Sequence, residues 1–311
     1  MRKFHFIINP ISGGGEGKQV LGFLPEIMTS MGFEENEWHA ELTKVETAQQ
    51  VARQALQNSE TVVAVGGDGT VSTILKAFLE LKNCKTRIGL IPLGTGNDLA
   101  RVLNLYDAYL NKGLLYLVRQ LVQARSRPMD IWQVNGEFAM VNYLSCGLDA
   151  RIAHDFHKDR ESGLIAGSSR FSNKVHYARR FFKDKHHQLD KVRLRYKDSQ
   201  GEWYSHDLSK MRTVIIGNIP SFASGAQPFL DSEIADGILE VVPVPSLWRF
   251  LGALSMGQSF VKVFLPNLKA QELILELDSF EFVQLDGEDI SNKVAEKIHI
   301  KHATNINVLT L

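Results

Sequence analysis

The stretch Val62-Val63-Ala64-Val65-Gly66-Gly67-Asp68-Gly69-Thr70 decides the fold of this chain. Its first four residues are small and apolar, three of them β-branched Val, and they predict a buried strand. The strand breaks abruptly into a glycine-rich turn, and after Thr70 apolar residues recur at helical spacing as far as Leu81. A strand, a glycine turn and a helix in this order allow backbone N–H groups to approach an anionic ligand.

A second copy of this arrangement follows directly. Ile88-Gly89-Leu90-Ile91 predicts the next buried strand, and residues 92–98, Pro-Leu-Gly-Thr-Gly-Asn-Asp, predict the next polar turn. Thr95 and Asn97 offer a hydroxyl and an amide in this turn. Two such turns at the ends of neighbouring strands would form one phosphate-binding site.

Each of the two turns also carries a carboxylate, Asp68 in the first and Asp98 in the second. A lone Asp in a turn usually serves local hydrogen bonding. Two carboxylates that converge beside a phosphate site instead suit coordination of Mg²⁺, directly or through water. We therefore expect a magnesium site at this edge of the sheet.

The order of the elements predicts two domains. Strands alternate with helices to about residue 124, beginning with a strand at residues 3–8, a loop at 9–17 and a helix from Lys18. This alternation predicts an α/β fold whose N-terminal part is a doubly wound parallel-sheet nucleotide domain, with ligands at the carboxyl ends of the strands. Beyond Pro128 strand-like runs dominate and predict a larger, mostly antiparallel β domain with helical insertions. We place the domains at residues 1–127 and 128–302, with the tail from about 303 to 311 returning to the first.

Within the second domain, Asn135-Gly136 predicts a hairpin turn between two strands, and residues 139–145 read as one further strand. Helical insertions are predicted at residues 150–160 and 174–182. Residues 221–237 lack apolar periodicity and form a long loop whose Asp231, Glu233 and Asp236 could hold a cation.

Asp286-Gly287 predicts a second, plain hairpin turn. The alternative at this position is that the following Glu288 reaches the reaction site as a base.

Composition limits the classes of partner. Hydrophobic residues make up 44% and charged residues 23%, and 35 Lys and Arg balance 35 Asp and Glu. A neutral globular chain without a nucleic-acid motif excludes a general polyanion binder, so we expect no nucleic acid partner. Two separate cysteines indicate a reducing compartment. An exposed sheet edge in the second domain could support a homodimer, but no sequence feature indicates one.

Local charge points to a membrane surface. No apolar run is long enough to span a bilayer. Residues 170–195 hold nine Lys and Arg against two Asp, with aromatic residues between them. Such a stretch is usually a solvated face, and in this neutral chain it could also bind anionic lipid. We expect a cytoplasmic protein in peripheral contact with the inner membrane surface.

Several blocks of the sequence together resemble the diacylglycerol kinase catalytic-domain family, over nearly the whole chain. The blocks at residues 92–101 and 142–153 are the most specific, since NAD kinases lack the first of these two. The blocks are Asn9-Pro10-Ile11-Ser12-Gly13-Gly14, residues 66–70, residues 92–101, residues 142–153 (Asn-Tyr-Leu-Ser-Cys-Gly-Leu-Asp-Ala-Arg-Ile-Ala), Asp236-Gly237-Ile238-Leu239 and Asp286-Gly287-Glu288.

The resemblance implies specific roles for residues of this chain. It implies that Asp68, Asp98 and Asp130 organise the catalytic Mg²⁺ through water, and that Glu288 is the base that takes the proton of the lipid hydroxyl. It implies a structural Mg²⁺ held by Asp236 and by the backbone carbonyls of Glu233 and Ile238. For the ATP site it implies Asn9, Ser12, Thr43, Gly66, Gly67, Asp68, Gly69, Thr70 and Thr95. Asn97 lies in the same turn as Thr95, and we expect it to contribute to the same site.

The sequence therefore predicts an ATP-dependent lipid kinase that phosphorylates the primary hydroxyl of diacylglycerol to phosphatidic acid, with Mg²⁺ as cofactor. Alternatives that stay open are a kinase for another lipid alcohol, such as a sphingoid base, ceramide or a polyprenol, and a non-catalytic nucleotide-binding regulator.

Overall fold

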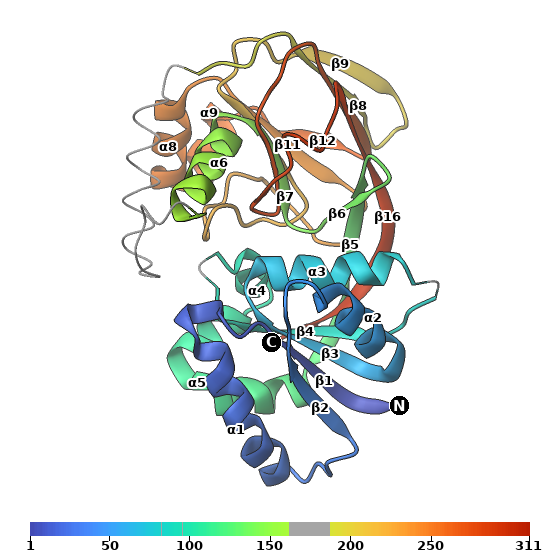
Figure 1. Cartoon of the computed structure of the whole chain (residues 1–311). Helices are drawn as coiled ribbons and strands as arrows, with labels where there is room; N and C mark the ends of the chain where they lie inside the picture. The colour runs from blue at the N-terminus through green and yellow to red at the C-terminus, as the bar shows by residue number, and fades with distance from the viewer. Residues whose placement is uncertain (82, 95, 162–186) are drawn as a thin grey trace. The chain divides into compact units, whose positions relative to one another are not determined.

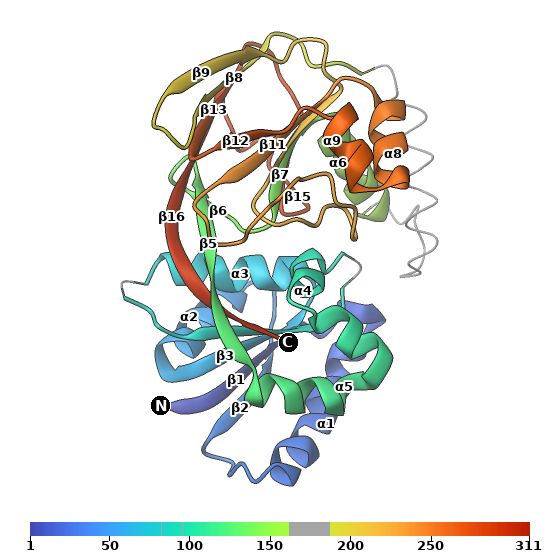
Figure 2. The same cartoon turned by 180° about the vertical axis from the view of Figure 1, so that it is seen from behind.

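The computed structural model describes residues 1–81, 83–94, 96–161 and 187–311. The chain forms two compact units (Figures 1 and 2). The first unit comprises Met1–Ile131, Ala223–Gly225 and Thr304–Leu311, and the second comprises Trp132–Phe222 and Ala226–Ala303. Two long strands, β5 (Arg125–Val134) and β16 (Lys297–Thr310), carry the chain from one unit to the other.

The first unit is a parallel sheet with helices on both faces. Its strands are hydrogen-bonded in the order β2-β1-β3-β4-β16, and the four pairs within this order are parallel. Helices α2 and α3 cover one face, and α1 and α5 lie on the other (Figure 1). The prediction of a doubly wound parallel sheet is confirmed. The elements are β1 (Arg2–Ile8), a short 3-10 helix η1 (Ser12–Gly14), α1 (Glu16–Ser30), β2 (Trp38–Leu42), α2 (Ala48–Asn58), β3 (Ser59–Gly66), α3 (Asp68–Leu79), β4 (Arg87–Pro92), α4 (Asp98–Val102) and α5 (Leu105–Gln123).

The second unit contains two antiparallel sheets. One runs in the order β12-β11-β10-β7-β14-β15, and the other contains β16, β13, β8 and β9. The mostly antiparallel second part is therefore also confirmed. Its elements are β6 (Phe138–Met140), β7 (Tyr143–Gly147), α6 (Leu148–Glu161), β8 (Val192–Lys197), β9 (Trp203–Asp207), β10 (Thr213–Gly217), β11 (Leu239–Val244), α8 (Leu247–Met256), α9 (Gln258–Phe264), β12 (Leu268–Ala270), β13 (Glu272–Leu277), β14 (Val283–Leu285) and β15 (Glu288–Asp289). The predicted helix at residues 174–182 lies outside the described residues.

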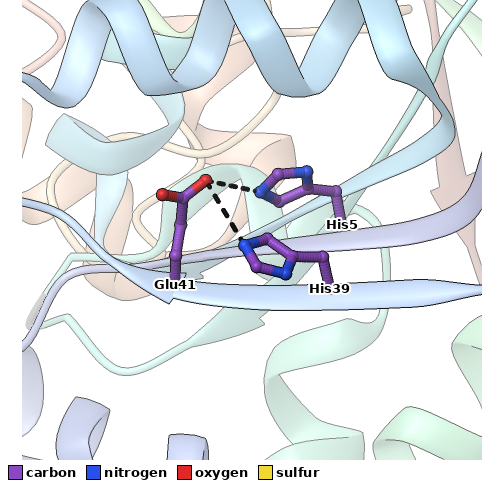
Figure 3. A group of neighbouring side chains, drawn as sticks. All are labelled: His5, His39 and Glu41. Atoms are coloured by element: carbon purple, nitrogen blue, oxygen red, sulfur yellow. Dashed lines mark hydrogen bonds and ion pairs between the residues drawn. The ribbon is translucent and has the colours of Figure 1, made fainter. Parts of the chain in front are cut away.

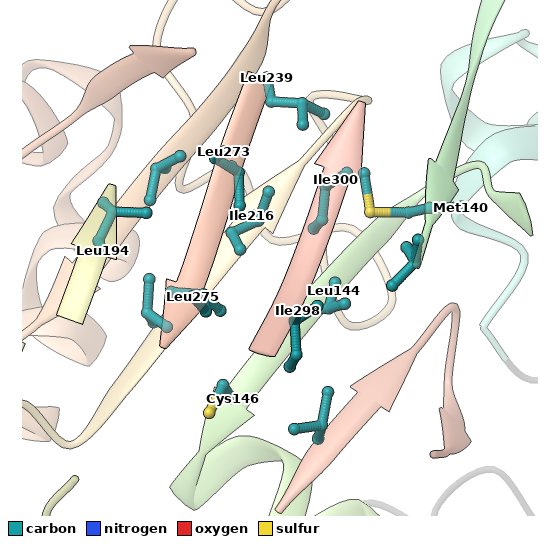
Figure 4. Close-up of a cluster of buried hydrophobic side chains, with 14 of the residues drawn as sticks. Met140, Leu144, Cys146, Leu194, Ile216, Leu239, Leu273, Leu275, Ile298 and Ile300 are labelled. Atoms are coloured by element: carbon teal, nitrogen blue, oxygen red, sulfur yellow. The ribbon is translucent and has the colours of Figure 1, made fainter. Parts of the chain in front are cut away.

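The core of the second unit lies between these sheets (Figure 4). Alternate residues of each strand point into it, because side chains along a strand alternate between the two faces. Leu144 and Cys146 of β7 thus share one buried cluster with Leu273 and Leu275 of β13. Burial of Cys146 raises the pKa of its thiol far above the ordinary range, which makes it an inert core residue.

Two hairpin turns have the left-handed backbone that their sequences predict. Asn135 and Gly136 have φ of 52° and 74° and join β5 to β6, which pair antiparallel. Asp286 and Gly287, with φ of 49° and 89°, join β14 to β15 in the same way. Positive φ at both central residues is the hairpin turn that Asn-Gly and Asp-Gly favour.

The prediction of one strand at residues 139–145 is wrong, because the run is split into β6 and β7 by the side chain of Asp286. Its carboxylate accepts the backbone N–H groups of Val141 (2.9 Å), Asn142 (2.8 Å) and Tyr143 (2.9 Å). Those N–H groups therefore bond to a side chain and not to a neighbouring strand. Burial raises the pKa of Asp286 to about 6, and the three N–H donors oppose this shift. The Asp-Gly turn thus also organises a segment 143 or more positions away.

No helix among the described residues is long and apolar enough to cross a membrane.

Replacing Asp286 by Ala is expected to destabilise the second unit. It would leave three backbone N–H groups without their acceptor, and a buried unsatisfied group costs about 1–3 kcal/mol. Relief of the buried charge offsets part of this cost, so we expect a net loss of about 2–4 kcal/mol. Urea unfolding followed by Trp fluorescence measures it, since Trp132, Trp203 and Trp248 lie in the second unit.

The matched control is Glu288→Ala, which changes an exposed carboxylate of the same hairpin. Its effect on stability should stay within about 0.5 kcal/mol. Equal stability of the two variants would contradict the organising role of Asp286.

Candidate functional site

The two glycine turns of the first unit pack backbone against backbone. Strands β3 and β4 are neighbours in register, with Gly66 opposite Pro92, so both turns leave the same edge of the sheet. The N–H groups of Leu93 and Gly94 donate to the carbonyl of Gly66 at 2.8 Å and 3.3 Å. A Cβ on Gly94 would lie 2.5 Å from the Cα of Gly67. No side chain fits at Gly94 unless one of the turns moves away.

Asp68 connects the first turn to the second. Its Oδ2 accepts the backbone N–H of Asn97 at 2.8 Å, and a Cβ on Gly96 would come within 2.6 Å of the same oxygen. The Asn97 side chain closes the second turn by hydrogen bonds with the N–H and the carbonyl of Gly94. Asn97 itself has a positive φ of 54°. The sequence predicted adjacent turns, whereas the contact between Asp68 and Asn97 depends on the register of β3 and β4.

Other residues predicted for the ATP site lie at the carboxyl ends of β1 and β2, in the same unit. Asn9 follows β1, and its N–H donates to Val65 of β3 at 3.0 Å. Thr43 follows β2 and donates both its N–H and its hydroxyl to Ile8. A Cβ on Gly66 would meet the hydroxyl oxygens of Thr70 at 2.2 Å and of Ser12 at 3.3 Å, so Ser12 also belongs to this edge. Thr95 lies outside the described residues.

The Thr70 hydroxyl is buried and has no hydrogen-bond partner among the described residues. An unsatisfied buried polar atom is unusual and calls for an explanation, such as a ligand or a bound water. Beside it lie the side chain of Ser12 and a glycine position where a Cβ would clash. Glycine backbone, hydroxyls and a carboxylate at one sheet edge are the chemistry that a nucleotide phosphate with Mg²⁺ requires.

Asp98 has a partner that sequence reasoning missed. Its two oxygens accept the backbone N–H groups of Ser224 and Gly225, each at 3.0 Å, and the residue is 1% exposed. The segment Ala223–Gly225 has positive φ throughout, which is costly for Ala223 and Ser224. Asp98 thus fixes a strained part of the long loop that the sequence marked as irregular. A single sequence contains no signal that pairs two positions 126 residues apart.

Asp130 lies on β5, and not in either turn. It is 1% exposed, and its carboxylate accepts the side-chain N–H of Asn305 from β16, in the same unit. The structure therefore gives Asp130 a partner on the returning C-terminal strand.

Glu288 belongs to the second unit, where it stands exposed on β15 directly after the Asp-Gly turn. The hairpin around it contacts the block at residues 142–153. Asp289 binds the Nδ1 atom of His154 at 2.7 Å, and Gln284 donates to the Ser145 hydroxyl at 3.0 Å. His154 thus anchors α6 to this hairpin.

The predicted structural cation site lies in the same unit. Asp236 accepts the N–H of Ile238 at 3.0 Å, which closes the loop before β11. Nearby Glu240, on β11, is fully buried, and neither of its carboxylate oxygens has a hydrogen-bond partner among the described residues. Burial raises the pKa of Glu240 to about 7 and the Asp236 charge raises it further, while the charge of Lys269 lowers it. Buried carboxylates are normally paired with a positive charge, and the residue opposite Glu240 on the neighbouring strand is Lys269. No sequence pattern singles out Glu240.

The basic stretch is described only from residue 187 onward, and Arg179, Arg180 and Lys183 lie outside the described residues. In the described part, Arg193 and Arg195 of β8 face Glu276 of β13 at 3.8 Å and 3.6 Å. Part of its positive charge is therefore balanced within the sheet.

Known proteins resemble this chain along most of its length. Mouse diacylglycerol kinase theta is 29% identical over 94% of this chain and 34% of its own length. Human diacylglycerol kinase zeta is 27% identical over 93% of this chain and 33% of its own length. The chain thus spans about a third of the length of these curated relatives. Among solved structures, a diacylglycerol kinase from Bacillus anthracis str. Sterne superposes with a TM-score of 0.71 at 17% identity, covering 100% of this chain and 97% of the other, which shows a shared fold.

Two family models account for most of the chain. The diacylglycerol kinase catalytic domain matches residues 3–134, which include both glycine turns and Asp130. The diacylglycerol kinase accessory domain matches residues 139–289, which include Asp286 and Glu288. Because these consecutive matches cover nearly all of both units, the chain belongs to the diacylglycerol kinase catalytic-domain family.

Proposed function

We propose that this chain transfers the γ-phosphoryl group of ATP to the primary hydroxyl of diacylglycerol and gives phosphatidic acid. The observation that carries the proposal is the packed pair of glycine turns, with Asp68 bonded across them to Asn97. The names of the relatives support the lipid acceptor. We further propose that the protein works in the cytoplasm, at the inner membrane surface.

Phosphoryl transfer depends on positioning the phosphates and on neutralising their charge. The backbone of the two turns, the start of α3 and the hydroxyls of Ser12 and Thr70 would hold the phosphates of ATP. Mg²⁺, when bound, would neutralise charge on their oxygens. Asp68 is the carboxylate best suited to hold the ion, since its Oδ2 already lies against the second turn.

Asp98 and Asp130 have different partners and would act differently. Each Asp98 oxygen already accepts a backbone N–H, so we assign Asp98 mainly to positioning Ala223–Gly225 beside the second turn, with any role toward Mg²⁺ through water. Asp130 is held by Asn305 on the returning strand and would likewise act through water.

Glu288 is proposed as the group that orients or deprotonates the acceptor hydroxyl. It is exposed, so an acceptor could reach it, while Asp286 and Gln284 fix the turn before it. A structural Mg²⁺ is proposed at Asp236 with the carbonyls of Glu233 and Ile238. The buried carboxylate of Glu240 supports a cation there and would add a ligand.

The proposal is tested by incubating the protein with labelled ATP and a panel of lipids comprising diacylglycerol, a sphingoid base, ceramide and a polyprenol. We expect label in phosphatidic acid. In the same assay Asp68→Asn should lower turnover by about 100-fold or more, because it removes the charge that would hold Mg²⁺. The amide keeps an oxygen for the Asn97 N–H, so thermal stability should be retained.

Two outcomes would count against this proposal. Label in another lipid alone would reassign the acceptor. Full turnover of a folded Asp68→Asn variant would remove this residue from the reaction.

A second prediction concerns the base. Glu288→Gln should lower the turnover number by about 100-fold or more while ATP affinity is unchanged, since a general base contributes to the chemical step. Titration with a fluorescent ATP analogue measures the affinity, and Glu276→Gln on β13 is the matched control. A collapse of ATP affinity in Glu288→Gln with normal turnover at saturation would show that Glu288 binds nucleotide and is no base.

A further inference from the structure

Helices α8 and α9 of the second unit are apolar on the side facing away from the core. Their inward residues Phe250, Ala253 and Val261, together with Leu265 directly after α9, pack into a buried cluster with β10 and β11. The other side exposes further apolar side chains. Leu251, Met256, Phe260, Val263 and Phe264, which we call the α8–α9 surface, are 42%, 62%, 41%, 73% and 47% exposed.

A helix on the surface of a soluble domain normally turns a polar face to water. On α8 and α9 the five apolar side chains of the α8–α9 surface share the exposed side with Arg249 and Lys262, and Phe260 and Phe264 stack on each other at 6.1 Å. Apolar residues gathered on an exposed face mark an interaction site.

The chain segment that forms this surface carries charge of one sign. Between Glu240 and Glu272 the sequence contains no Asp or Glu, although the whole chain is neutral. The same interval contains Arg249 on α8, Lys262 on α9 and Lys269 on β12. Arg249 and Lys262 are both exposed. Apolar side chains flanked by cations suit the boundary between lipid headgroups and acyl chains.

We propose that the α8–α9 surface docks on an anionic lipid bilayer. The proposal rests on the proposed function, since a lipid acceptor must be reached at a membrane. The helices have 10 and 7 residues, too few to span a bilayer, so they would lie in the interface. The exposed cations Arg249 and Lys262 favour anionic lipid over a second copy of the chain, whose matching surface would carry the same cations.

The test is sedimentation of the full chain with vesicles of mixed phosphatidylglycerol and phosphatidylcholine, in the absence of ATP. The variant Leu251→Ser/Val263→Ser/Phe264→Ser should bind at least about tenfold more weakly, since each apolar group contributes by burial. Arg249→Gln/Lys262→Gln should weaken binding about fivefold per charge, and only for anionic vesicles.

The matched control is Leu110→Ser/Leu115→Ser on α5, which changes comparably exposed leucines of the first unit and should leave vesicle binding unchanged. Unaltered binding of the α8–α9 variant would overturn the proposal. So would a dimer in light scattering that this variant dissociates while vesicle binding persists, because the surface would then join two copies.

Activity separates this proposal from the proposed function. The α8–α9 variant should lose phosphorylation of long-chain diacylglycerol in vesicles but keep that of a short-chain, water-soluble diacylglycerol. Inactivity of the wild-type chain toward both acceptors would refute the proposed function, whereas the vesicle measurement would still decide the docking surface.

A different observation carries a second proposal. His5 of β1 and His39 and Glu41 of β2 lie on one face of the first unit's sheet, because His5 is paired with His39 and Glu41 is two residues further along (Figure 3). The Nε2 atoms of His5 and His39 lie 2.8 Å and 4.0 Å from Glu41 Oε1, and one ligand atom of each residue lies within 4.8 Å of the others. The His5 side chain is 5% exposed, and those of His39 and Glu41 are 41% and 34% exposed.

We infer that this His-His-Glu cluster binds a Zn²⁺ ion or a similar divalent transition metal. Bonds of about 2.0–2.2 Å place two ligand atoms no more than about 4.4 Å apart, so small rotations of the exposed His39 and Glu41 would suffice. Two imidazoles and a carboxylate favour zinc over magnesium.

Isothermal titration of the EDTA-treated full chain with Zn²⁺ tests this inference. We expect one site, a rise in the thermal unfolding midpoint with Zn²⁺, and no competition from excess Mg²⁺. His39→Ala changes the exposed ligand and should weaken binding at least about tenfold. His206→Ala, an exposed histidine on β9, is the control. Equal affinities in His39→Ala and the wild type, or absence of zinc binding in the wild type, would overturn the inference.

Discussion

The contact between the backbones of the two glycine turns is the constraint on which the first unit depends. Strands β3 and β4 are adjacent and parallel, so their carboxyl ends must share one edge of the sheet. Gly94 lies so near Gly67 that even a methyl group would separate the turns. Their closeness brings Asp68 within hydrogen-bond distance of the Asn97 N–H. A polar site is thus assembled where the absence of side chains permits two backbones to touch.

Two buried aspartates hold distant segments in place by the same physical means. Asp98 accepts two N–H groups from Ala223–Gly225, and Asp286 accepts three from residues 141–143. Hydrogen bonds to an ionised carboxylate are short and strong, particularly where water is excluded. Both residues lie in blocks of the sequence that resemble the family, beside residues with proposed chemical roles. Loss of activity on truncating either one would therefore mix structural and chemical effects.

Features set by short stretches of sequence were predictable. The β3 strand and its turn, the alternation that gives the doubly wound sheet, and the Asn135-Gly136 hairpin all follow from local periodicity and turn preference.

Features that depend on the pairing of distant segments were not predictable. Glu41 meets His5 only after β1 and β2 align, and Asp286 splits residues 139–145 from far along the chain. Glu240 reads as an ordinary polar strand residue, because its burial depends on what covers β11. The exposure of Phe260, Val263 and Phe264 on α9 was not predictable either, since these residues are as apolar as those that face inward.

An enzyme that transfers a group from a nucleotide to a lipid needs one surface that binds a ligand from water and another that contacts a bilayer. The polar turns of the first unit suit a charged ligand from water, through glycine backbone, hydroxyls and carboxylates. The α8–α9 surface of the second unit suits a bilayer, through apolar side chains within a stretch free of acidic residues. Exposed apolar area carries a risk of aggregation in water, so a chain retains it where the area has a partner. If the proposed function holds, the bilayer is that partner, because a lipid acceptor has to be reached where it lies.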